Sequence, residues 1–211
     1  MKIFIVGATG RVATKLIEQL TLEGHEILAG ARSPERVLRS PHVTPLKLDL
    51  HAGLETLSEL VKDADAIYFV AGSRGKDLLQ TDAFGAVKIM QVAEKNHINR
   101  FIMLSSAFSL EPEQWKKRGM EDLLDYNIAK FFADNYLVHQ SKLDYTILQA
   151  AALIEEKGSH RIALNENSGT KNTIQNVAET LAAIIKFDNT SKKIIKMSDG
   201  KTPIDEALTQ I

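Results

Sequence analysis

Short apolar runs alternate with amphipathic stretches along most of the chain. Residues 3–6 (Ile-Phe-Ile-Val) are wholly apolar and mostly β-branched, and Gly7 follows them. This pattern is typical of a strand buried on both faces of a parallel sheet. In residues 12–22 the apolar positions recur at helical spacing and Gly24 comes after them, so this segment is predicted to form a helix.

The alternation repeats through the next 130 residues or so. Further strands are predicted at 26–31, 45–50, 66–71, 100–105 and 145–150, with helices between them at 53–62, 81–96 and 121–141. Strands alternating with helices of this length indicate βαβ crossovers. The predicted fold class is therefore α/β with a doubly wound parallel sheet.

Two stretches break the alternation. Residues 108–119 contain Pro112, Trp115 and a basic cluster, and this irregular composition predicts a loop over a site. Residues 151–173 are polar and glycine-bearing, with one candidate strand at 161–164, and we expect them to form a small C-terminal substrate lobe. A helix at 175–186, a strand at 193–197 and a short helix after Pro203 follow. We predict one domain over residues 1–211, with 151–173 as a substrate-side insertion.

Composition and charge narrow the classes of function. The net charge is −1, with 25% charged and 44% hydrophobic residues, which argues against disorder and against a surface built as a whole to bind nucleic acid. Cysteine is absent, which excludes a disulfide scaffold and a thiol nucleophile. No apolar run reaches the length of about 18 residues that spans a bilayer. The first residues lead directly into an apolar strand and show no small-residue cleavage site, so we expect no signal peptide. We expect a cytoplasmic protein with no membrane or nucleic-acid partner.

A glycine-containing turn between the first strand and the first helix is the strongest functional signal. It consists of Gly7, Ala8, Thr9, Gly10, Arg11 and Val12. Gly7 permits a tight turn, Gly10 lets the backbone approach a pyrophosphate, and Ala13 is small enough for close packing of helix on strand. The helix N-terminus adds free N–H groups and the positive end of a dipole. The turn therefore predicts a dinucleotide site, and its position between strand and helix outweighs the alternative of a merely structural turn.

The end of the second predicted strand indicates which dinucleotide is bound. The sequence there is Ala31-Arg32-Ser33, without the acidic residue that would bind a ribose 2′-hydroxyl. Arg32, supported by Ser33, Arg36 and Arg11, can clamp a 2′-phosphate through charge-assisted bonds. We therefore predict NADP(H) in preference to NAD(H); the alternative is an ordinary solvated basic loop.

A tyrosine and a lysine four residues apart suggest acid–base chemistry. Tyr126 and Lys130 lie on one face of the predicted helix 121–141, where a cation favours the phenolate form of a neighbouring tyrosine. Such a pair can move a proton to or from an oxygen during hydride transfer. Ser105 and Ser106, at the carboxyl end of the fifth strand, are predicted to hold the same oxygen. A chance pair on an amphipathic helix is the alternative.

These segments together resemble the short-chain dehydrogenase/reductase superfamily, in its atypical branch of small NAD(P)H-binding Rossmann-fold proteins. The resemblance covers nearly the whole chain and rests on the glycine turn, Ala31-Arg32, 48–50, 70–72, 104–106, the Tyr126 and Lys130 pair, and 143–148. It implies that Asp49 and Leu50 flank the adenine and that Ala71 and Gly72 lie against the cofactor. It also implies that Lys130 reaches the nicotinamide ribose, and that Tyr126 is the acid/base assisted by Ser105 or Ser106.

The chain departs from this pattern at two places. Ala13 stands where the group usually has glycine, and Gln149-Ala150-Ala151 stands where relatives typically carry Arg-Pro-Gly near the nicotinamide. Two functions remain open. One is an oxidoreductase, or an epimerase-like enzyme, acting on a small organic carbonyl or alcohol. The other is a non-catalytic dinucleotide sensor resembling NmrA-like proteins.

The remaining candidates are set aside. The six histidines show no spacing that would indicate zinc, so no metal is expected. Glu155-Glu156 are adjacent and cannot converge on one substrate, and the basic run 116–118 is short enough for an ordinary exposed face. Aromatic residues in 131–137 follow helical spacing, which indicates core or a dimer face. The expected partner is a small-molecule substrate, and the expected state is a monomer or homodimer.

Overall fold

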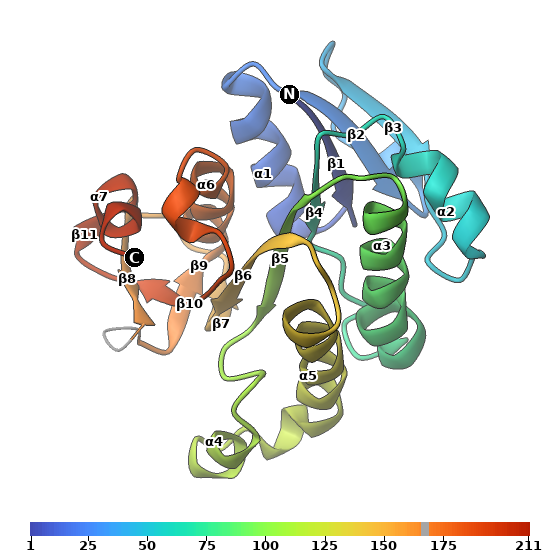
Figure 1. Ribbon diagram of the computed structural model, residues 1–211. Helices are drawn as coiled ribbons and strands as arrows, with labels where there is room; N and C mark the ends of the chain where they lie inside the picture. The colour runs from blue at the N-terminus through green and yellow to red at the C-terminus, as the bar shows by residue number, and fades with distance from the viewer. Residues whose placement is uncertain (166–168) are drawn as a thin grey trace.

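A nine-stranded sheet forms the centre of the molecule in the computed structural model, which describes residues 1–165 and 169–211 (Figure 1). Its strand order is β11-β8-β10-β6-β5-β4-β1-β2-β3. The strands are β1 (Lys2–Val6), β2 (Glu26–Ala31), β3 (Val43–Lys47), β4 (Ala66–Phe69), β5 (Arg100–Ser106), β6 (Asp144–Ala150), β8 (Arg161–Leu164), β10 (Lys193–Asp199) and β11 (Thr202–Pro203). From β10 to β3 the strands are parallel, whereas β8 is antiparallel to both β10 and β11. The predicted doubly wound parallel sheet is confirmed.

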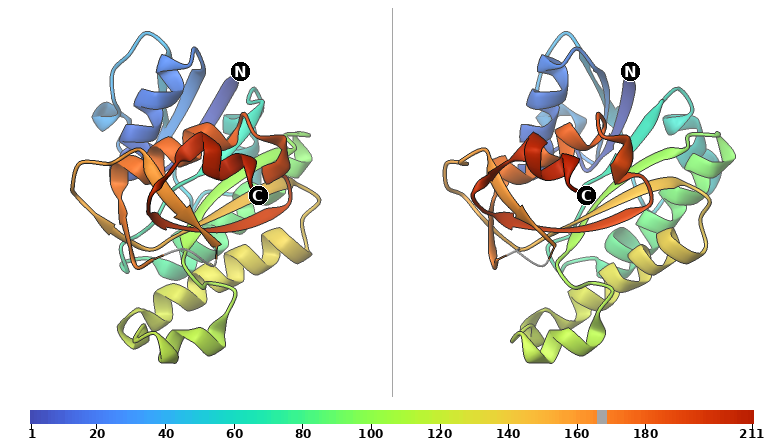
Figure 2. Two further views of the ribbon diagram at one scale, coloured as in Figure 1. Left: turned by 90° about the vertical axis from the view of Figure 1, so that its left-hand side faces the viewer. Right: turned by 60° about the vertical axis from the view of Figure 1, so that its left-hand side comes forward.

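Helices cover both faces of the sheet (Figures 1 and 2). They are α1 (Arg11–Leu22), α2 (Leu54–Val61), α3 (Phe84–Lys95), α4 (Pro112–Lys117), α5 (Leu124–His139), α6 (Ile174–Ile184) and α7 (Ile204–Thr209). α1 and α6 pack together on one face, and α2, α3 and α5 pack on the other. None of the described helices is long and apolar enough to cross a membrane.

The apolar run of β1 explains why the sheet is buried on both faces. Ile3 and Ile5 belong to the core beneath α1 and α6, whereas Phe4 and Val6 belong to the core beneath α2 and α3. All four side chains are fully buried. A strand with this alternation of contacts needs apolar residues at every position, as its sequence has.

Several predicted boundaries differ from the structure. β3 ends at Lys47 and β4 at Phe69, so Asp49 and Ala71 lie just beyond their strands. The segment predicted as an irregular loop, 108–119, contains α4. The third predicted helix begins with the π-helical turn η2 (Leu78–Ala83), and the fourth begins with the 3₁₀ turn η3 (Glu121–Leu123).

The segment 151–173 is divided between two sheets. β7 (Ala152–Ile154) pairs with β9 (Lys171–Thr173) in a separate two-stranded parallel sheet, and β8 joins the edge of the main sheet. Residues 166–168, part of the predicted insertion, lie outside the described residues. Leu153 of β7 lies against the site described below.

Candidate functional site

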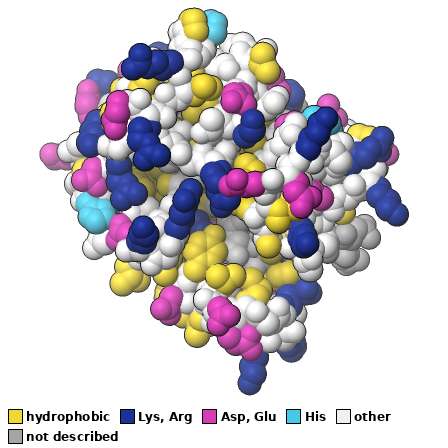
Figure 3. All heavy atoms as spheres, turned by 180° about the vertical axis from the view of Figure 1, so that it is seen from behind, with side chains coloured by type: hydrophobic (Ala, Val, Ile, Leu, Met, Phe, Trp, Pro, Cys, Tyr) yellow, Lys and Arg dark blue, Asp and Glu magenta, His cyan; other side chains and the backbone are white. Residues whose placement is uncertain are grey.

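A cavity of about 1180 Å³ lies at the carboxyl ends of β1, β2, β4 and β5. In open α/β sheets ligands bind at this edge, where the strand order reverses, here between β1 and β4. The predicted site residues that line it are Gly7, Thr9, Gly10, Arg11, Val12, Arg32, Asp49, Leu50, Ala71, Gly72, Tyr126 and Lys130. Ala8, Ser33, Ser105 and Ser106 are not among its lining residues. Figure 3 shows Lys and Arg side chains gathered beside a hollow in one face of the molecule.

The turn between β1 and α1 is tied to the neighbouring strands. The N–H groups of Gly7 and Ala8 both donate to the carbonyl oxygen of Gly30, each at 3.0 Å. Gly7 has φ +89°, and a Cβ there would lie 2.6 Å from the Cα of Ala71, so this position requires glycine. Since the Ala8 N–H already donates to Gly30, it is not available to donate a hydrogen bond to a phosphate.

The N-terminus of α1 is open to a ligand. Gly10 precedes the helix in extended conformation, and no side chain caps the helix. The N–H groups of the first turn therefore keep their hydrogen-bonding capacity for an anion. The cavity beside it, with a volume of about 1180 Å³, is lined by this turn and by basic side chains, and these donor groups suit a pyrophosphate.

Basic side chains line one end of the cavity. They are Arg11, Arg32, Arg36, Arg74 and Lys76. Arg11 also pairs with Glu155, with 2.7 Å between Nη1 and Oε1. Sequence reasoning missed Arg74 and Lys76. The signal that could have found them is the run Gly-Ser-Arg-Gly-Lys at 72–76, shortly beyond β4, because a glycine-rich basic loop near a strand's carboxyl end suits phosphate binding.

Hydrogen bonds fasten the loop after β4 to the loop after β3. Asp77 accepts from the Thr81 hydroxyl at 2.5 Å and lies 2.7 Å from His51 Nε2. These bonds, first from Thr81 and then from His51, lower the pKa of the Asp77 carboxyl. The backbone N–H of His51 donates to Asp49 Oδ1 at 2.9 Å. This part of the cavity therefore has a rim that is fixed by hydrogen bonds.

Tyr126 and Lys130 lie at the other end, on the first turns of α5. Lys130 is only 2% exposed, and its Nζ is 5.7 Å from the centre of the Tyr126 ring. Its counter-ion is the fully buried Asp82, whose Oδ1 lies 3.8 Å from Nζ. Asp82 also accepts from the Ser73 N–H at 2.9 Å. Lys130 is thus fixed between a phenol and a carboxylate.

Ser105 and Ser106 donate their hydroxyls to buried acceptors. Ser105 donates to Asp134 Oδ2 at 2.6 Å, and Ser106 donates to Asn127 Oδ1 at 3.1 Å. Sequence reasoning missed Asp134 and Asn127 because they lie on α5, more than 20 residues away in the sequence. Neither serine hydroxyl is arranged as the predicted partner of the substrate oxygen in this structure.

Asp134 lies at the centre of a buried polar network. Its Oδ2 also accepts from Ser109, whose Oγ accepts in turn from the Gln149 amide at 2.8 Å. Burial raises the pKa of Asp134 to about 6, although the two serine hydroxyls and the Lys130 charge act in the opposite direction. Gln149, part of the segment in which we expected a departure from the family pattern, thus joins this buried hydrogen-bonded network.

Comparison with known proteins decides the family. A model of the NAD(P)H-binding family matches residues 7–188, from the glycine turn to beyond α6. The chain belongs to this NAD(P)H-binding family. The resemblance to small atypical short-chain dehydrogenase/reductases is confirmed with it.

Individual known proteins match over all or nearly all of the chain. The oxidoreductase ylbE from Lactococcus lactis is 45% identical, with a TM-score of 0.97 over 100% of this chain and 96% of that one. "Uncharacterized sugar epimerase YhfK" from Bacillus subtilis is 31% identical, and the match covers all of both chains. A short-chain dehydrogenase/reductase from Veillonella parvula in complex with NADP has 19% identity and a TM-score of 0.77 over 97% of both chains, a likeness of fold alone.

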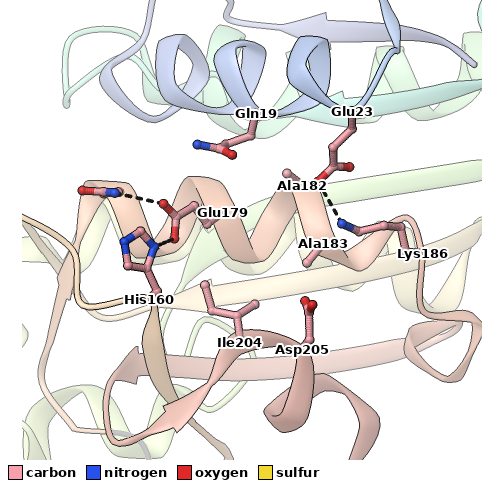
Figure 4. A pocket seen from close by; sticks show the side chains of 10 residues that line it. Gln19, Glu23, His160, Glu179, Ala182, Ala183, Lys186, Ile204 and Asp205 are labelled. Atoms are coloured by element: carbon pink, nitrogen blue, oxygen red, sulfur yellow. Dashed lines mark hydrogen bonds and ion pairs between the residues drawn. The ribbon is translucent and has the colours of Figure 1, made fainter.

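A second, smaller cavity in this NAD(P)H-binding protein lies between α1, α6 and α7 (Figure 4). Its volume is about 380 Å³. Its charged side chains include two ion pairs, Glu23 with Lys186 at 2.8 Å and His160 with Glu179 at 2.7 Å. None of the predicted site residues lines it. The predicted site residues that line either of these two cavities all line the larger one.

Proposed function

We propose that this protein is an NADP(H)-dependent oxidoreductase that interconverts a small organic carbonyl compound and its alcohol. One observation carries the proposal: the glycine turn and the Tyr126 and Lys130 pair line the same cavity. A dinucleotide with its pyrophosphate on α1 would therefore direct its nicotinamide toward Tyr126. Family membership supports the use of a nicotinamide cofactor.

The preference for NADP(H) rests on charge at the end of β2. Arg32 and Arg36 are exposed and line the cavity, and the position after Ala31 carries no carboxylate. Guanidinium groups bind phosphate through charge-assisted, bidentate hydrogen bonds. Arg74 and Lys76 add positive charge to the same cavity. A 2′-phosphate gains more at such a wall than a 2′-hydroxyl does.

In this proposal Tyr126 transfers the proton to or from the substrate oxygen, and Lys130 stabilises the phenolate form of Tyr126. When bound, the nicotinamide supplies a hydride to the carbonyl carbon or accepts one from the alcohol. In the reducing direction the Tyr126 hydroxyl donates a proton to the carbonyl oxygen, which completes the alcohol, and Tyr126 regains a proton from solvent. The Lys130 ammonium stabilises the phenolate formed at that moment. Asp82 keeps this ammonium beside the ring.

The sensor function remains the second candidate. The observation in its favour is that Ser105 and Ser106 donate their hydroxyls to Asp134 and Asn127 and not toward Tyr126. Such a protein would bind the dinucleotide and turn nothing over.

The test is NADPH oxidation by a panel of small aldehydes and ketones, with Tyr126→Phe compared with the wild type. General acid catalysis contributes about 10²–10⁴-fold, so we expect kcat to fall at least about 100-fold while the Kd for NADPH stays unchanged. Tyr136→Phe is the matched control, because Tyr136 lies on the same helix, accepts from Gln91 and does not line the cavity. Equal turnover by the two variants would remove the role of Tyr126. Tight NADPH binding without turnover of any carbonyl would favour the sensor.

A further inference from the structure

The cavity differs in charge between its two ends. Its lining carboxylates are Asp49, Glu121, Asp122 and Asp125, so all but Asp49 fall in the five residues that precede Tyr126. The three are exposed. The exposed arginines and lysine of the lining come instead from the segments after β1, β2 and β4. The dinucleotide end is therefore basic and the substrate end acidic.

Leucine side chains also line the cavity. Leu104 comes from β5, Leu153 from β7, Leu123 from η3 and Leu124 from the first position of α5. Leu123 is 49% exposed and Leu124 is 48% exposed. Large apolar side chains left half-exposed at the mouth of a cavity are typical of a surface that an apolar ligand covers.

Nearby cations do not offset the acidic mouth. Lys130 is buried and paired with Asp82. Arg118, close in sequence, stacks on the Phe108 ring with 3.7 Å between its Cζ and the ring centre, and it does not line the cavity. Arg11 lies at the glycine turn and pairs with Glu155. In the part of the chain that the structure describes, no exposed Lys or Arg of the lining comes from the substrate-end segments.

From this arrangement we propose that the substrate is an apolar carbonyl compound or alcohol that is neutral or positively charged, and that anionic substrates are selected against. The inference rests on the proposed function, since it concerns the space beside Tyr126. It excludes sugar nucleotides and carboxylate-bearing carbonyl compounds as good substrates. Several like charges around a cleft raise the local concentration of counter-ions by about tenfold or more, and the effect falls with ionic strength.

The test uses three benzaldehydes of similar shape with different charge at the para position: trimethylammonio, tert-butyl and sulfonate. We expect kcat/KM for NADPH-dependent reduction to be highest for the cation and lowest for the anion. Because the aldehydes also differ in intrinsic reactivity, the decisive quantity is the cation-to-anion ratio compared between proteins. In Glu121→Gln/Asp122→Asn/Asp125→Asn this ratio should fall by about tenfold, and in wild type it should shrink as salt is added.

The matched control is Glu55→Gln/Asp63→Asn/Glu206→Gln. It changes the net charge equally at exposed positions that do not line the cavity, so the ratio should stay at the wild-type value. A wild-type preference for the sulfonate, or a ratio equal in both triple variants, would overturn the charge inference while leaving the oxidoreductase intact. If no aldehyde is reduced, the oxidoreductase proposal fails, and binding of the same aldehydes to the NADPH complex, followed by nicotinamide fluorescence, still decides the charge preference. Tighter binding of the cation supports the inference, and tighter binding of the sulfonate overturns it.

Discussion

Arg32 is the residue on which the choice between the two nicotinamide dinucleotides depends. It is exposed, lines the cavity and follows β2 directly. Replacing it with alanine removes a charge-assisted contact to the 2′-phosphate, which is worth about 1.5–3 kcal/mol, so the Kd for NADPH should rise about tenfold or more. The Kd for NADH should not change. Fluorescence titration of each cofactor measures both values.

Arg39→Ala provides the control for this prediction. Arg39 is an exposed arginine in the same segment that does not line the cavity, so NADPH affinity should be unaffected there. Equal losses of NADPH affinity in the two variants would mean that the positive charge of the segment as a whole attracts the cofactor, without a specific contact from Arg32. If the affinity of Arg32→Ala for NADH falls as strongly as its affinity for NADPH, the assignment of Arg32 to the 2′-phosphate is contradicted.

Asp134 should make stability depend on pH in an unusual direction. Its folded-state pKa of about 6 lies above its ordinary value of 3.8, so the folded protein holds the proton more tightly than the unfolded chain does. The stabilisation is present below about pH 4 and is lost as pH rises through 6, with a total of about 3 kcal/mol. We expect the free energy of unfolding of wild type, relative to Asp134→Asn, to fall by that order between pH 4 and 7.

Urea unfolding, followed by the fluorescence of the single tryptophan Trp115, measures this difference at each pH. All other titrating groups are common to the two proteins, so subtraction isolates Asp134. The account of the network around Ser105 and Ser109 would be wrong if the wild-type advantage stayed constant or grew with pH.

Among the elements, the β1–α1 turn is constrained both by its conformation and by β4. Gly7 and Gly24 both have positive φ, but only Gly7 has backbone atoms of a neighbour within reach of an added Cβ. Gly24→Ala should therefore lower the free energy of unfolding only by the strain of a positive φ, about 1–2 kcal/mol, and NADPH affinity should stay unchanged. Gly7→Ala adds overpacking against Ala71, about 1–3 kcal/mol more, and displaces the pyrophosphate site. Chemical denaturation measures the stability of both variants, and titration measures their NADPH affinity. Equal losses of stability and affinity in the two variants would contradict this prediction.

Comparison of the elements with their predictions shows which features of the fold and the site can be predicted from the sequence. The apolar runs of β1 and β2 and the periodicity of α1 and α6 predicted those elements to within one or two residues, because burial on the sheet imposes these patterns. The six-residue helix α4 is too short for a helical period to register. The glycine turn and the Tyr126 and Lys130 pair are local motifs and were visible. The counter-ion of Lys130 and the acceptors of Ser105 and Ser106 were not, because packing of α5 and η2 brings them together over long sequence separations.

At the scale of the whole molecule, the cavity lies where the two halves of the chain meet. The first half, with β1 to β4, provides the glycine turn and the basic side chains, and the later segments provide Tyr126 and Leu153. Arg11 and Glu155 bridge these halves, but their side chains are 47% and 67% exposed. An ion pair so exposed contributes at most about 1 kcal/mol. The halves are therefore joined by the continuous sheet and by the packing of α1 on α6.

The two outermost strands of this sheet share one feature. β3 contains Pro45, and β11 is only Thr202–Pro203. Proline has no N–H, so each border of the sheet offers an interrupted row of donors to any strand that approaches it. Such borders resist the edge-to-edge stacking through which exposed β-structure polymerises into fibrils. A sheet of nine strands can in this way stay open at both sides without recruiting further copies into a growing aggregate.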